Sequence, residues 1–86
     1  MRKPISKEEF EKVLDKVRLA TEWQIKNKGD GAFVSTHEIV GVIQEEYSEL
    51  LEELHKNNNQ AFATELIDIA IACLWGYASM VANNEK

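Results

Sequence analysis

The chain has 86 residues, of which 44% are hydrophobic and 29% are charged, and its formal net charge is −5. This length allows one small domain with a single core, and we expect it to span residues 1–86. The single cysteine excludes an intrachain disulfide framework and is typical of a protein of the reducing cytoplasm.

The charges are distributed unevenly along the chain. Residues 1–28 carry eight Lys and Arg against five acidic residues, whereas residues 29–86 carry two bases against ten acids. Nucleic-acid binding needs a basic face, so an acidic body leads us to expect no nucleic-acid partner. The basic first segment either meets the phosphates of a ligand or forms a solvated helix face.

The first predicted element is a helix over about residues 6–26. Four glycines and one proline in the whole chain leave few turns, which favours long helices. Ser6 and Glu9 have the spacing of a capping box, which marks a helix start. An apolar stripe follows at helical spacing, and a second strip with Leu19 and Trp23 lies on nearly the opposite side. Two apolar strips indicate two partners, and a second subunit and a ligand are the candidates.

A loop over residues 27–35 separates this helix from a second predicted helix over about residues 36–56. The loop contains two of the four glycines, and Ser35 with Glu38 repeats the capping-box spacing. At 100° per residue, Glu46 and Glu49 lie beside the apolar stripe of the second helix, whereas Glu45 points away from it. We therefore expect Glu46 and Glu49 to face inward.

The third predicted helix, over about residues 60–82, follows a turn of three asparagines. It is apolar nearly all round, and its only charged residues are Glu65 and Asp68. Its uncharged part, residues 69–82, is shorter than the roughly 20 residues of a membrane span, so we expect a buried helix and no membrane partner. Within one chain, the other two helices cannot cover the third helix on most of its sides. We predict an all-α chain in which helices two and three form an antiparallel hairpin, and two hairpins build a four-helix-bundle core on homodimerisation.

Four carboxylates occur as two pairs in the sequence, Glu46 with Glu49 and Glu65 with Asp68. Residues three apart share a face of a helix, so two antiparallel helices can aim all four into one small volume. Like charges this close repel one another unless cations or protons intervene, and hard oxygen ligands suit Mg²⁺ or Mn²⁺. The alternative is a salt-bridged network, but after residue 28 only Lys56 and Lys86 are available to pair with these acids.

The two pairs and their surroundings resemble the all-α nucleoside triphosphate pyrophosphatase superfamily, the MazG-like and dimeric dUTPase-like proteins. That family carries E-x-x-E and, after a spacer, E-x-x-D on two antiparallel helices. The matching segments here are EEYSELLEEL and ELIDIAIACLW, and the resemblance covers about residues 36–82. The chain departs from the MazG pattern at Ile67, where glycine is frequent, and at Trp75, where a polar residue is frequent.

The resemblance implies a MazG-like helical domain that hydrolyses (d)NTPs to (d)NMPs and pyrophosphate in nucleotide-pool housecleaning, as a homodimer or homotetramer. It implies a Mg²⁺ cofactor, with Mn²⁺ as a substitute. The implied metal ligands are Glu46, Glu49, Glu65 and Asp68, and Glu49 is our candidate for the catalytic base. The base and sugar of the substrate do not follow from the resemblance.

Three further residues are candidates for substrate binding: Trp23, Lys26 and Trp75. In the family the end of the first helix covers the nucleotide, which implies stacking by Trp23 and phosphate contact by Lys26 and Lys28. The alternative is a dimer-interface tryptophan with surface lysines, and for Trp75 it is a place in the core. The alternative function is a non-enzymatic helical dimerisation or interaction module that binds a partner through Leu19 and Trp23.

Overall fold

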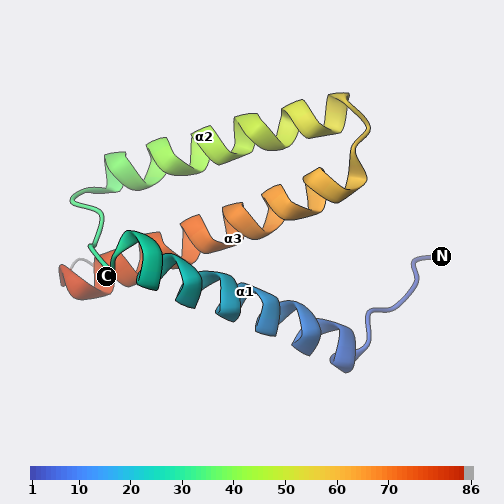
Figure 1. Cartoon of the computed structure of the whole chain (residues 1–86), viewed down its shortest axis with the longest axis horizontal. Coiled ribbons are helices and arrows are strands. Elements are labelled where there is room, and N and C mark those ends of the chain that lie inside the picture. The colour runs from blue at the N-terminus through green and yellow to red at the C-terminus, as the bar shows by residue number, and fades with distance from the viewer. Residues whose placement is uncertain (85–86) are drawn as a thin grey trace. The chain divides into compact units, whose positions relative to one another are not determined.

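A computed structural model of the chain describes residues 1–84 and contains three α-helices (Figure 1). Helix α1 spans Lys7–Lys28, α2 spans Thr36–His55 and α3 spans Asn59–Ala82, and no strand occurs in the described part. The predicted all-α fold with three helices is confirmed. Contacts divide the chain into two compact units, Met1–Asp30 and Gly31–Lys86, and each is described by itself. The single-domain organisation stays a prediction, and Lys86 lies outside the described residues.

Helix α1 begins at the predicted capping box and ends at a glycine. The Ser6 hydroxyl accepts a hydrogen bond from the Glu9 backbone N–H at 3.0 Å, and the Glu9 carboxylate accepts one from the Ser6 N–H at 2.9 Å. The helix runs two residues beyond the predicted end, to Lys28, because Gly29 is the first residue to leave the helical region, with φ of 94°. No residue of α1 is buried.

Helices α2 and α3 form the predicted antiparallel hairpin, and they run side by side in Figure 1. The turn between them uses the asparagines: Asn57 adopts φ of 57°, and the Asn58 side chain accepts from the Ala61 N–H at 3.1 Å. Asparagine suits both roles, since it tolerates the left-handed region and caps helix starts. Helix α2 therefore ends at His55, and α3 begins at Asn59, one residue from each predicted bound.

The two helices approach closely where α3 has a glycine, Gly76. A Cβ atom built on Gly76 would lie 2.7 Å from Cγ2 of Ile39 on α2, so a larger residue would collide with that side chain. The buried residues among those described all belong to α3, namely Ile71, Ala72, Gly76 and Ser79. The hairpin therefore buries little apolar surface within one chain.

Two side chains of α3 and the side chain of Asn83, which caps its C-terminus, hold the segment that precedes α2. The Trp75 Nε1–H donates to the Gly31 carbonyl at 2.9 Å, the Phe33 N–H donates to the Ser79 hydroxyl at 2.9 Å, and the Asn83 amide donates to the Phe33 carbonyl at 3.0 Å. These residues recur every four positions, so they form one row along the helix. The row fixes part of the predicted loop, and Ser79 is buried.

Helix α3 is long and apolar enough to cross a membrane by length and composition, because its 24 residues include only two charged ones, Glu65 and Asp68. The core helix of a soluble protein meets the same criterion, so this property is weak evidence for a membrane span. The expected cytoplasmic location and the absence of a membrane partner stay predictions.

Candidate metal centre

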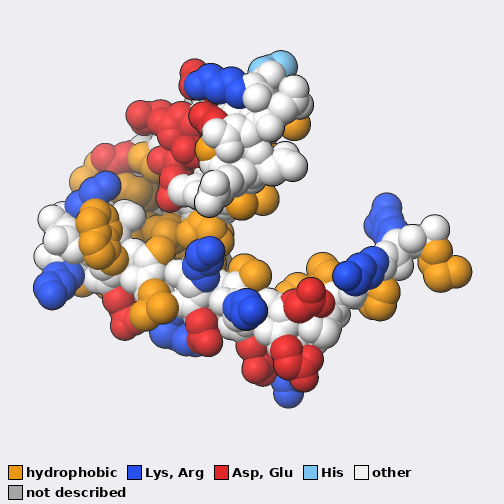
Figure 2. All heavy atoms as spheres, turned by 45° about the vertical axis from the view of Figure 1, so that its right-hand side comes forward, with side chains coloured by type: hydrophobic (Ala, Val, Ile, Leu, Met, Phe, Trp, Pro, Cys, Tyr) orange, Lys and Arg blue, Asp and Glu red, His pale blue; other side chains and the backbone are white. Residues whose placement is uncertain are grey.

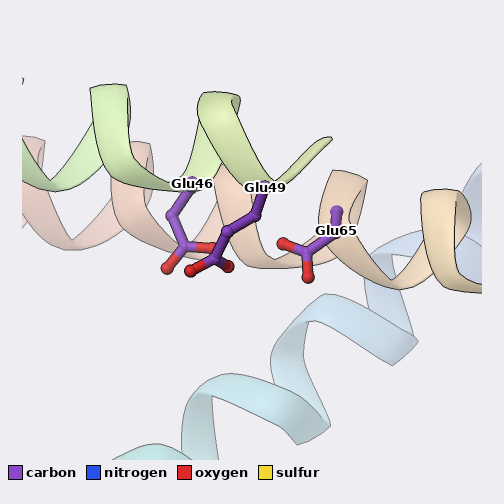
Figure 3. A group of neighbouring side chains, drawn as sticks. All are labelled: Glu46, Glu49 and Glu65. Atoms are coloured by element: carbon purple, nitrogen blue, oxygen red, sulfur yellow. The ribbon is translucent and has the colours of Figure 1, made fainter. Parts of the chain in front are cut away.

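Three carboxylates from the two helices of the hairpin meet at one point. Glu46 and Glu49 lie one turn apart on α2, and Glu65 reaches toward them from α3 (Figure 3). One carboxylate oxygen from each residue lies within 4.8 Å of the others, and all three residues are half-buried. We call these three residues the acidic cluster. Oxygen ligands at this separation fit around a single hard cation such as Mg²⁺ or Mn²⁺.

Two oxygens of the acidic cluster have no partner in the protein. Oε2 of Glu46 and Oε2 of Glu65 are buried without a hydrogen bond. Ion pairs among the described residues join Arg18 to Asp15 and Lys56 to Glu53, so no lysine or arginine neutralises the cluster within residues 1–84. Buried carboxylate oxygens normally have a partner, and a bound cation would supply it. The donor set therefore fits a divalent metal ion.

The environment of the cluster resists ionisation. Removal from water raises the pKa of Glu65 from its ordinary value of 4.5 to about 7, and the charges of Asp68, Glu49 and Glu46 add to this shift. The pKa of Glu46 is also raised, first by desolvation and then by the charges of Glu49 and Asp68. Below a pH of about 7 the Glu65 carboxyl therefore keeps its proton, in line with its raised pKa. A cation would replace that proton and remove the repulsion.

The raised pKa of Glu65 predicts how the stability of the metal-free protein depends on pH. Between pH 4.5 and about 7 the native state holds a proton that the unfolded chain has lost, so the free energy of unfolding falls as pH rises through this window. We expect a fall on the order of 1 kcal/mol after allowance for solvent screening. Urea unfolding in EDTA at pH 5, 6, 7 and 8 measures it, and Glu65→Gln should flatten the profile. A stability that rises from pH 5 to 8, and does so equally in both proteins, would contradict this account.

The fourth predicted ligand, Asp68, lies one turn beyond Glu65 on α3 and outside the group of three. It is half-buried, and its charge contributes to the raised pKa values of both Glu46 and Glu65. Asp68 therefore belongs to the electrostatic surroundings of the acidic cluster, and its role as a metal ligand stays a prediction.

The predicted substrate-binding residues are placed in two units. Trp23 and Lys26 lie on α1, where both are exposed and Lys28 Nζ lies 6.0 Å from the centroid of the Trp23 ring. Trp75 is half-buried on α3, and its indole N–H is bonded to the Gly31 carbonyl. The polar edge of Trp75 thus has a structural partner, and the predicted contacts of all three residues with a nucleotide remain untested.

The sequence contains one further pairing of metal-ligand types, Glu52 and His55, three residues apart on α2. This Glu-x-x-His spacing is one that carboxylate-bridged metal proteins use. Both side chains are exposed, and the His55 Nδ1 donates to the Leu51 carbonyl at 2.8 Å. The pair lies outside the group of three carboxylates, so it adds no ligand to the acidic cluster.

Comparison with known proteins identifies no relative: no protein-family model, no curated protein and no solved structure matches the chain. The likeness to the MazG-like superfamily therefore rests on the residues of the two carboxylate pairs and their surroundings.

Proposed function

We propose that this chain is a Mg²⁺-dependent nucleoside triphosphate pyrophosphohydrolase that converts (d)NTPs to (d)NMPs and pyrophosphate and so clears surplus or non-standard nucleotides. The observation that carries the proposal is the acidic cluster, in which three carboxylates from two helices converge and two buried oxygens lack a partner. The E-x-x-E and E-x-x-D spacings on α2 and α3 support the same reaction class. Mn²⁺ is expected to substitute for Mg²⁺.

In this proposal the three residues of the acidic cluster have different roles. Glu46 and Glu65 hold the ion with the oxygens that have no protein partner. When bound, Mg²⁺ would neutralise the triphosphate and polarise its phosphoryl oxygens. Glu49 has no buried unpartnered oxygen, so it is our candidate to accept a proton from the attacking water. The water oxygen bonds to the α-phosphorus while the bond to the bridging oxygen breaks, and pyrophosphate leaves.

Residues of α1 are proposed to hold the rest of the substrate. The exposed ring of Trp23 offers a surface for stacking on a base, and Lys26 and Lys28 offer positive charge for phosphate oxygens. These roles follow from residue chemistry and the family resemblance. The acidic hairpin itself repels a free triphosphate, so the substrate would arrive with its metal ion.

Incubation with Mg²⁺ and a panel of standard and modified (d)NTPs and (d)NDPs tests the proposal, with monophosphate, pyrophosphate and phosphate as readouts. We expect monophosphate plus pyrophosphate from one or a few nucleotides. Removing an essential carboxylate in Glu49→Gln or Asp68→Asn should lower turnover by about 100-fold or more. The control is Glu52→Gln, which removes the same charge from an exposed position of α2.

Wild-type turnover in both variants would show that the acidic cluster is not the catalytic site. The second candidate function, a non-enzymatic interaction module, is favoured by the exposure of Leu19 and Trp23 on α1, at 67% and 59%. In that case no nucleotide is hydrolysed and partner binding is indifferent to Mg²⁺, because it depends on apolar area.

A further inference from the structure

One residue of the segment before α2 is held through both of its backbone groups by the C-terminal part of α3 and its cap. The Phe33 N–H donates to the Ser79 hydroxyl at 2.9 Å, and the Phe33 carbonyl accepts from the Asn83 amide at 3.0 Å. One turn back along α3, the Trp75 indole N–H donates to the Gly31 carbonyl at 2.9 Å. We call Trp75, Ser79 and Asn83 the polar row. All of these residues belong to the second of the two units, so their bonds do not depend on where α1 lies.

Ser79 is the central member of the polar row and is only 2% exposed. Its hydroxyl donates its one proton to the Trp75 carbonyl at 2.7 Å, so a lone pair of the oxygen is left to face Phe33. A hydroxyl whose proton is engaged in this way can only accept from the Phe33 N–H, which fixes the direction of the bond. The bond is directional and shielded from water, so it holds Phe33 at a defined place along α3.

The same segment is tied to α2 by the bonds of the helix cap. The Val34 N–H donates to the Glu38 carboxylate at 2.7 Å, and the Glu38 N–H donates to the Ser35 hydroxyl at 3.2 Å. Phe33 therefore cannot move along α3 without moving the start of α2. Because a helix is stiff over a few turns, the position of Phe33 also sets where the carboxylates of α2 lie, roughly three to four turns further along.

The rest of the hairpin does little to fix how far α2 is shifted along α3. The buried residues among those described are Ile71, Ala72, Gly76 and Ser79, and contact between apolar surfaces has no preferred direction. Residues 45–68 carry seven acidic side chains and one lysine, and Figure 2 shows acidic side chains gathered on the hairpin. Their repulsion pushes the helices apart near the turn. The polar row resists it, because it holds the helices together at the opposite end of the hairpin.

We propose that the polar row sets the register of α2 on α3, and that Ser79 is thereby a positioning residue for the acidic cluster. In the observed register, one oxygen each of Glu46, Glu49 and Glu65 lies within 4.8 Å of the others. A shift of one helical turn is about 5.4 Å, which exceeds this separation and would remove Glu65 from the group. The effect on metal binding rests on the proposed function, whereas the effect on the register does not.

The distance between the two helices at the acidic cluster measures the register directly and needs no metal. Nitroxide labels at Ser48→Cys and Ala63→Cys, in a Cys73→Ser background, place one probe at an exposed position of each helix. Double electron–electron resonance in EDTA, on labelled protein diluted with unlabelled protein, should give one narrow distance distribution. Ser79→Ala should broaden this distribution to about the 5 Å of a helical turn, because Phe33 is released.

Two controls separate positioning from a general loss of stability. Ile71→Val removes one buried carbon atom from α3 and keeps the polar row, so it should lower the urea midpoint while the distance distribution stays narrow. Asn83→Asp removes the amide that donates to Phe33, whereas Asn84→Asp makes the same charge change one residue beyond the row. Of these two, only Asn83→Asp should broaden the distribution, and this pair decides the question if Ser79→Ala does not fold.

Binding of Mn²⁺, followed by the electron paramagnetic resonance signal of the free ion, measures the effect on the acidic cluster. Ser79→Ala should weaken Mn²⁺ binding by about 10-fold or more, whereas Ile71→Val should leave it unchanged. An unchanged distance distribution in Ser79→Ala and Asn83→Asp would overturn the register role, and so would equal broadening in Ile71→Val. A distribution that Ser79→Ala broadens, in a protein that binds no Mn²⁺, would support the register role and overturn the proposed metal centre.

Discussion

Replacing Glu65 with glutamine is expected to raise the melting temperature of the metal-free protein at pH 8 and to abolish its further rise with Mg²⁺. At pH 8 the Glu65 carboxyl, with its pKa of about 7, is ionised in a site that disfavours the charge. Glutamine keeps the shape of the side chain and removes the charge, which relieves repulsion with Glu46 and Glu49. A gain on the order of 1 kcal/mol corresponds to about 5 °C for a domain of this size.

The rise in melting temperature on adding Mg²⁺ should be smaller in Glu65→Gln than in the wild type. A ligand that binds only the native state stabilises it by about 2.7 kcal/mol at 100 times its dissociation constant, so wild-type protein should melt well above its metal-free temperature. In Glu65→Gln a neutral amide replaces one of the charged metal ligands, so this variant should show little of this rise. Differential scanning fluorimetry with and without Mg²⁺ measures both effects. Glu52→Gln controls for net charge and should behave as wild type. A variant that melts lower without metal, yet keeps the full Mg²⁺ response, would remove Glu65 from the site.

Replacing Gly76 with alanine is expected to destabilise the hairpin. Alanine normally favours a helix over glycine by about 1 kcal/mol, but the added Cβ would lie 2.7 Å from Cγ2 of Ile39. Ile39 branches at Cβ, so this methyl group cannot swing aside as the end of a flexible side chain would. Overpacking of this kind costs about 1–3 kcal/mol. The net result should be a fall in unfolding free energy of about 1 kcal/mol, measured by urea unfolding.

Gly41 provides the matched control on α2. A Cβ atom built there meets no atom within 4 Å, so Gly41→Ala should stabilise the protein by roughly 0.5–1 kcal/mol. In a double-mutant cycle, Ile39→Ala should cost less in the Gly76→Ala background than in the wild type, because the two sites are in contact. Equal stabilisation by Gly76→Ala and Gly41→Ala would mean that the helices are not packed this closely at Ile39.

Much of the fold could be predicted because local signals mark the helix ends. The Ser6 capping box is formed as the spacing predicts, and Asn58 caps α3. The second capping box is only half formed: Ser35 accepts from the Glu38 N–H, but the Glu38 carboxylate accepts from the Val34 N–H at 2.7 Å. In either arrangement the Glu38 carboxylate accepts from a free backbone N–H near the helix start, so spacing alone does not distinguish the two donors.

The candidate site was predictable in outline for a similar reason. Spacing of three places each carboxylate pair on one helix face, and the short asparagine turn makes the helices antiparallel, so convergence of Glu46, Glu49 and Glu65 follows. The separate position of Asp68 depends on how far each helix is shifted along the other, which periodicity does not encode. The bonds of Ser79 and Asn83 to Phe33 were also unpredictable, because they reach a backbone forty-six and fifty residues away.

The asparagine turn has a consequence for the rate of folding. Asn57 and Asn58 join two helices across only a few residues, so closing the hairpin costs little chain entropy and its contacts are mostly local. The acidic residues lie close to this turn in sequence, and they come together as soon as the helices dock. Their repulsion therefore opposes closure of the hairpin. A divalent cation bound between these carboxylates would screen the repulsion, so hairpin closure is expected to be faster in its presence.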